Sequence, residues 1–291
     1  MITFESIEQM LSDCAASGLP LWENILLSDC DKQNISREQS WRKMAWMLEN
    51  MIQANRTYRT GDRSASALVG GDGGKLEQYA HQSDALCGPY PSEVIAVAVK
   101  MGECNACMKR IVAAPTAGAC GVLPAVLLPF PRFFPAAEED LIQALYTAAG
   151  FGQIIASRAS IAGAEGGCQA EIGSAAAMAA AALVQLRGGS PEQMAHACAM
   201  AIKNLLGLVC DPVGGLVEVP CVKRNVIGAM AALSSAQMAL AGVKSRVPPD
   251  QVLDAMDEVG RALPASLRET GIGGLAGTAF GRQYRPEEKS I

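Results

Sequence analysis

The chain has 291 residues, and its 24 basic and 29 acidic side chains give a net charge of −5. Half of the residues are hydrophobic and 18% are charged, which excludes a disordered protein, and the lack of a Lys/Arg-rich run argues against a nucleic-acid-binding surface. Aromatic residues make up only 5%, whereas Gly occurs 29 times and Ala 48 times. Because small side chains let helices approach closely, we predict an all-α fold, a compact bundle of Ala/Gly-rich buried helices with loops at the helix ends.

The helices expected from the sequence are separated by Gly- and Pro-containing loops. A capping box at 36–39 predicts a helix over 36–55, and the Gly/Ser-rich stretch at 60–75 is the only candidate for an internal boundary. We therefore expect an N-terminal helical segment over 1–60 and a second helical domain over 61–291, or one continuous domain. Further helices are predicted over 91–101, 138–155, 168–186, 190–206, 221–243 and 248–263.

Two uncharged stretches, 111–131 and 225–243, are long enough to span a membrane. Four prolines interrupt the first, and the second is mostly Ala with several polar residues. Since neither has the density of Leu, Ile and Phe that a lipid-facing helix needs, we expect buried segments of a soluble protein. The first ten residues do not resemble a signal peptide, so we expect a cytoplasmic protein whose ten cysteines stay reduced.

Three non-periodic stretches at helix ends, 113–121, 163–171 and 210–221, combine Gly or Pro with polar residues and cysteine. Cys168 and Cys221 are expected at helix starts, where amide dipoles favour a thiolate. Together with Cys210 they are either small buried side chains or the three thiolate ligands of a [4Fe–4S] cluster, an anion that suits helix N-termini. Their spacing matches no ferredoxin motif, so both interpretations stay open at this point.

The remaining cysteines and histidines give weaker signals. Cys104 and Cys107 form a CxxC with no second pair to complete a zinc site, so helix packing is the expected role, as it is for Cys120. His81 and His196 are the only histidines, which counts against a His-rich metal site and a Ser-His-Asp triad.

Taken together, the three stretches resemble the α chain of the bacterial iron–sulfur L-serine dehydratases. That family carries A-P-T-A-G-S-C-G, G-A-x-G-G-C-Q-A-E and C-D-P-V-x-G-L-V-E-x-P-C-x-x-R-N, and this sequence follows them in the same order at 114–121, 163–171 and 210–225. The resemblance covers residues 60–280, approximately. It implies that Cys168, Cys210 and Cys221 hold a catalytic [4Fe–4S] cluster in an all-helical domain, here 61–291, and that L-serine is the substrate.

This sequence departs from the family pattern in two places and lacks one family motif. The family's S-x-S-G-L-T-G-G-D occurs at 64–72 with Ala67 and Val69 in place of Gly and Thr, and Ala119 stands where the family usually has Ser. The family's Ser-Ser-His-Thr motif is absent, and in two-chain members it belongs to a separate β chain. We therefore expect an alpha subunit with a β chain as partner, and we also consider a homodimer formed through the Ala-rich helices.

The reaction that the resemblance implies is α,β-elimination, in which an open iron stabilises the departing hydroxide and a base removes the Cα proton. The candidate substrate-binding residues are Thr116, Ala117, Gly118, Lys223, Arg224 and Asn225. Thr116 could instead cap a helix, and Lys223 and Arg224 could be solvated charges. The candidate bases, or acceptors that orient other site groups, are Glu165, Asp211 and Glu218.

Two other functions remain as alternatives at the sequence level. A related cluster lyase would release sulfide from L-cysteine (a desulfidase), and a comparison of serine and cysteine turnover separates it from a serine enzyme. A non-catalytic helical scaffold would use its cysteines only for packing and would contain no iron after anaerobic purification.

Overall fold

The computed structural model describes residues 4–285, and its regular elements are helical throughout that range. No strand occurs there, although one isolated bridge joins Cys210 to Arg268. The prediction of an all-α fold is therefore confirmed. The helices, with shorter 3-10 and π turns labelled η, are α1 (Ile7–Ser17), α2 (Leu21–Gln33), α3 (Arg37–Arg56), α4 (Asp72–Ala80), α5 (Pro89–Ala106), α6 (Val122–Leu127), α7 (Phe130–Phe133), α8 (Glu138–Arg158), α9 (Gly163–Gly166), η1 (Gln169–Gly173), α10 (Ser174–Leu186), α11 (Pro191–Lys203), η2 (Val213–Gly215), α12 (Cys221–Leu240), α13 (Pro249–Ala262), η3 (Ala265–Leu267), η4 (Gly274–Gly277) and η5 (Gly281–Tyr284).

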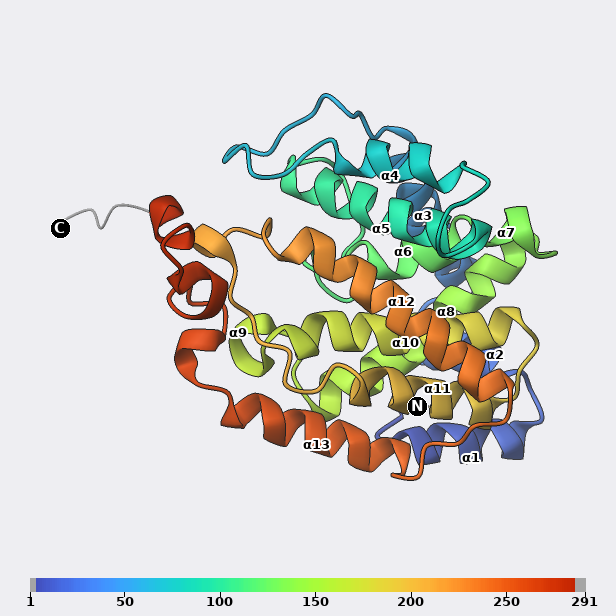
Figure 1. Ribbon diagram of the computed structural model, residues 1–291. Coiled ribbons are helices and arrows are strands. Elements are labelled where there is room, and N and C mark those ends of the chain that lie inside the picture. The colour runs from blue at the N-terminus through green and yellow to red at the C-terminus, as the bar shows by residue number, and fades with distance from the viewer. Residues whose placement is uncertain (1–3, 286–291) are drawn as a thin grey trace.

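Helix α10 is the centre of the core. Every residue from Ser174 to Val184 is buried, and seven of these eleven are Ala. Helices α8, α11 and α12 pack around α10, with α6 also in contact (Figure 1). The small side chains explain why so many helices reach one central helix, because Ala adds little distance between neighbouring backbones.

The first three helices pack on the rest of the chain. Helices α2 and α3 contact α8, and α1 contacts α11 and α13. Asp250, in the first turn of α13, accepts hydrogen bonds from the backbone amides of Ile7 and Glu8 at 2.8 and 3.0 Å. A carboxylate at these amides satisfies orphan donors at the start of α1. The division of the chain at residue 60 stays a prediction.

Local sequence motifs predicted the first residues of most helices correctly. The predicted capping boxes are present, with Ser36 and Gln39 at the start of α3 and Ser190 and Gln193 at the start of α11. The apolar stretch 111–131 does not form one helix, because its prolines divide it into α6, α7 and loops. Among the described residues, no helix combines the length and hydropathy that a membrane span needs.

The segment expected as one helix over 168–186 has a different first turn. Residues Gln169–Gly173 form a π turn, and the α-helix proper begins at Ser174. Such turns widen the helix locally and often occur at functional sites. Figure 1 shows α9, the start of α12 and the chain that follows α13 gathered at one end of the molecule.

Candidate functional site

The three cysteine-containing stretches are joined by hydrogen bonds between side chains and backbone. Asn225, on the first turns of α12 and 1% exposed, donates from Nδ2 to the carbonyls of Gly118 and Cys221 at 2.9 and 3.0 Å. Its Oδ1 accepts from the amide of Gly121 at 2.8 Å. Asn225 was predicted to bind substrate, but both of its amide hydrogens are already used, one by Gly118 in the 113–121 loop and the other by Cys221 within α12.

Thr116 connects the first stretch to the second. Its Oγ1 donates to Oε1 of Glu171 at 2.7 Å. The helix-cap alternative for Thr116 is wrong, because Gly121 occupies the N-cap position of the next helix, α6. Ala117 is exposed on the same loop, and Gly118 is half-buried.

The thiols of Cys168, Cys210 and Cys221 are buried, at 3%, 3% and 8% exposure. They lie close enough for Cys168 and Cys221 to act electrostatically on Cys210, and for Cys168 to act on Cys221. Burial is the main cause that raises the pKa of Cys168 to about 11 and that of Cys221 to about 12, and it also raises the pKa of Cys210. Three thiolates would repel one another here, so this donor set fits a group that brings positive charge among them.

Arg224 is a cation that acts on Cys168 and Cys221. It interacts with Cys168, whose pKa it lowers, and donates to the carbonyl of Val209 at 2.7 Å and to Oδ1 of Asp211 at 2.8 Å. Asp211, 4% exposed, also accepts from the amide of Leu275 at 2.8 Å. The Asp211 carboxylate therefore holds Arg224 beside the thiols, and Arg224 is not a solvated charge.

Glu171 is the site residue that the sequence reasoning missed. Burial raises its pKa, the nearby Glu269 raises it further, and the hydrogen bond from Thr116 lowers it. Its charge also raises the pKa values of all three cysteines, which places the carboxylate near them. Its position three residues after Cys168 was the available signal, because residues at this spacing on a helical turn face the same side.

Two glycines allow this carboxylate to lie directly against the backbone. A Cβ atom on Gly163 would lie 2.8 Å from Glu171 Oε2, 3.0 Å from Cys210 Sγ and 3.1 Å from Glu269 Oε2. A Cβ on Gly118 would lie 3.0 Å from Glu171 Oε1. Because Gly163 and Gly118 lack side chains, Glu171 packs against the backbone at both positions, and the Cys210 thiol packs against it at Gly163. These contacts form one wall of the thiol site, by which we mean the surroundings of the Cys168, Cys210 and Cys221 thiols.

The arrangement differs from a site for a single ion. In the range 4–285, no three or more His, Cys, Asp or Glu side chains are placed to hold one metal ion. A single zinc ion needs its ligands within about 2.0–2.3 Å. An iron–sulfur cluster takes each thiolate on a different iron, so its ligands are spread around a larger group.

The other predicted site residues lie around the third stretch. Lys223 is 73% exposed and forms an ion pair with Asp72 at 3.3 Å. Glu218, 6% exposed, accepts from Ser64 Oγ at 2.8 Å and also from Ser66. The 64–72 segment, where Ala67 and Val69 replace the family's Gly and Thr, is thus fastened directly to this stretch.

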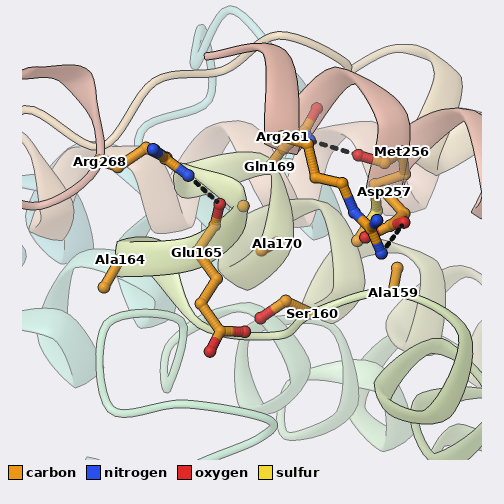
Figure 2. Close-up of a pocket in the computed structure, with 11 residues that line it drawn as sticks. Ala159, Ser160, Ala164, Glu165, Gln169, Ala170, Met256, Asp257, Arg261 and Arg268 are labelled. Atoms are coloured by element: carbon orange, nitrogen blue, oxygen red, sulfur yellow. Dashed lines mark hydrogen bonds and ion pairs between the residues drawn. The ribbon is translucent and has the colours of Figure 1, made fainter. Parts of the chain in front are cut away.

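Glu165 lies at a separate cavity of about 290 Å³, shown in Figure 2. Glu165 is exposed, and none of Cys168, Cys210 and Cys221 lines this cavity. Of the two carboxylates in the second stretch, Glu171 is the one whose charge acts on the thiols. The catalytic roles assigned from sequence to Glu165 and Asp211 stay predictions.

Among residues 4–285, neither histidine forms a hydrogen bond or an ion pair with the three cysteines of the thiol site. His81 is 59% exposed and faces Glu93 at 3.8 Å. His196 lies on α11, and its Nδ1 is buried without a hydrogen-bond partner among the described residues.

Comparison with known proteins gives consistent matches. A family model described as "Serine dehydratase alpha chain" matches residues 16–276. The chain is 44% identical over 288 residues to the probable L-serine dehydratase, alpha chain, of Bacillus subtilis, covering 99% of this chain and 95% of that protein. It is 40% identical over 278 residues to the L-serine dehydratase, alpha chain, of Peptoniphilus asaccharolyticus, covering 95% of each. L-serine dehydratase 1 of Escherichia coli is 46% identical over 181 residues, which are 62% of this chain and 40% of that protein.

Proposed function

Because the chain belongs to the serine dehydratase alpha chain family, we propose that it deaminates L-serine to pyruvate and ammonia. In this proposal Cys168, Cys210 and Cys221 hold a [4Fe–4S] cluster, and the chain is the alpha subunit of a two-chain enzyme. The observation that carries the proposal is that separate segments bring three buried thiols together, beside the Glu171 carboxylate and the Arg224 guanidinium.

When bound, a cluster with three protein thiolates supplies one open iron as a Lewis acid for a substrate oxygen. The reaction removes the Cα proton and the β-hydroxyl of serine, which together leave as water. The resulting enamine tautomerises to an imine, and water hydrolyses the imine to pyruvate and ammonia.

The residues of this chain would bind the substrate and move its proton. The amides around Gly118 form a surface for the substrate carboxylate, and Asn225 holds this loop in place. We assign removal of the Cα proton to the Glu171 carboxylate. The Thr116 hydroxyl orients this carboxylate by donating a hydrogen bond to its Oε1 atom. Arg224, positioned by Asp211, places positive charge beside Cys168.

A partner chain would complete the site. The relative from Escherichia coli contains much sequence outside the aligned region, since the alignment covers 40% of it, whereas the two relatives named as alpha chains align over 95% of their length. This chain also lacks the Ser-Ser-His-Thr motif. We therefore propose a β chain that covers the thiol site, excludes water and contributes polar groups.

The cluster is tested with protein purified without oxygen, by iron and sulfide content and by the visible absorption band. Cys168→Ser, Cys210→Ser and Cys221→Ser should each lose iron and the band. Cys87→Ser, at an exposed cysteine, is the matched control and should retain both. Unchanged iron in all three variants would refute the ligand assignment.

Pyruvate formation tests the reaction and the partner. The reconstituted chain should deaminate L-serine faster than it releases sulfide from L-cysteine, and only when the β chain is present. Glu171→Gln should lower kcat by about 10²–10⁴-fold, the usual contribution of a catalytic base. Glu258→Gln, at an exposed carboxylate on α13, is the control and should keep wild-type kcat. Preference for L-cysteine would support the desulfidase alternative instead.

A further inference from the structure

The cavity in Figure 2 contains a cation without a counter-charge. Arg268 forms no ion pair among residues 4–285, its Nε is buried without a hydrogen-bond partner, and its NH1 has one long contact of 3.5 Å to the carbonyl of Glu165. The other arginine at the cavity, Arg261, is paired with Asp257 at 2.8 Å. Arg268 is therefore the guanidinium that is free to bind an anion here.

The same cavity contains a carboxylate without a partner. The described part of the chain gives the Glu165 side chain neither a hydrogen bond nor an ion pair. Figure 2 shows this side chain extending from its backbone toward Ser160 and away from the Arg268 guanidinium. The cavity thus holds one positive and one negative group that do not neutralise each other.

From this pair of separated charges we infer that the cavity is a binding site for a small zwitterionic α-amino acid. The ligand's carboxylate would accept from the Arg268 guanidinium, which matches a carboxylate in a bidentate geometry. Its ammonium would donate to the Glu165 carboxylate. The volume of about 290 Å³ lies just below the usual range of ligand cavities, about 300–1,000 Å³, and so favours a small molecule.

The position of the cavity connects it to the thiol site. Gly166, Gln169 and Ala170, on either side of Cys168, form part of its wall. A backbone bridge joins Arg268 to Cys210. The Cys210 amide donates to the carbonyl of Leu267 at 2.8 Å, and the Cys210 carbonyl accepts from the amide of Glu269 at 2.7 Å. An amino acid in this cavity would therefore contact the segments that carry two of the three cysteines without touching the thiols.

The test is isothermal titration of the full chain with L-alanine, a zwitterion that has no β-hydroxyl to eliminate. Arg268→Gln and Glu165→Gln should each weaken binding about tenfold or more, because each removes one charge-assisted contact. Arg42→Gln, at an exposed arginine on α3, is the matched control and should bind like the wild type. Acetate and methylammonium, which carry one charge each, should bind more weakly than L-alanine.

Hydrogen exchange locates the bound ligand. L-alanine should slow amide exchange over 256–268 in the wild type and not in Glu165→Gln. Because Glu165 is exposed, its replacement should leave the fold intact, so the test remains valid even if Arg268→Gln does not fold. Failure of the wild type to bind, wild-type affinity in both variants, or equal affinity for acetate would overturn the assignment. The inference does not depend on the proposed reaction, since binding is measured without turnover.

Discussion

Replacing Gly163 by Ala adds one methyl group at the wall of the thiol site. The new Cβ would lie 2.8 Å from Glu171 Oε2 and 3.0 Å from Cys210 Sγ. Comfortable separations between such atoms are about 3.5–4.0 Å, so the carboxylate and the thiol must each move by roughly 0.5–1 Å. The backbone does not oppose the substitution, because Gly163 is not among the glycines with positive φ.

The expected consequence is a folded protein with a damaged site. Overpacking costs about 1–3 kcal/mol of stability, and a displacement of about 1 Å in a catalytic group lowers the rate by roughly 10²-fold. We therefore expect Gly163→Ala to lower serine deamination about 100-fold and to reduce the iron bound after anaerobic reconstitution, with a modest decrease in the urea midpoint.

Gly173→Ala is the matched control, since its Cβ would meet nothing closer than 3.8 Å, at Leu205. This substitution, at the end of the π turn, should leave iron content and activity unchanged and be neutral or stabilising by up to about 1 kcal/mol. Full iron content and wild-type kcat in Gly163→Ala would refute the inference that position 163 must lack a side chain for Glu171 and Cys210 to keep their places.

Three further predictions concern the 113–121 loop, the start of α1 and the proposed cluster. Asn225→Ala removes two hydrogen bonds that fasten the 113–121 loop to α12 and a third one within α12, so the free energy of unfolding should fall by about 2–4 kcal/mol in urea denaturation, and an unchanged midpoint would contradict the role of Asn225. Asp250→Ala removes two acceptors at the first amides of α1 and should cost about 1 kcal/mol, whereas Asp254→Ala, one turn later, should cost less than half of that. Serine deamination should decay in air and return with ferrous iron and a thiol, because an iron without a protein ligand is open to oxidants; full activity of metal-free protein would exclude the cluster.

Short-range sequence patterns determined where several helices begin and that the core is helical. Ser36 and Ser190 each cap a helix through a partner three residues later, so both helix starts could be predicted from local geometry alone. The Ala-rich composition predicted the helical core around α10 for a similar reason, since small residues permit close packing wherever their helices meet. The motif resemblance also selected Cys168, Cys210 and Cys221 from ten cysteines.

Only the tertiary structure decided which polar groups face the thiols. Glu165 and Glu171 lie six residues apart in one motif, yet the π turn and the hydrogen bond from Thr116, 55 residues away in the chain, bring Glu171 to the cysteines, while Glu165 lies at another cavity. Asn225 is the last residue of the third motif and lies in α12. Its hydrogen bond to Gly118, 107 residues earlier in the chain, shows that it holds two distant segments together. Such roles depend on which distant segments pack together, and packing is set by the whole core.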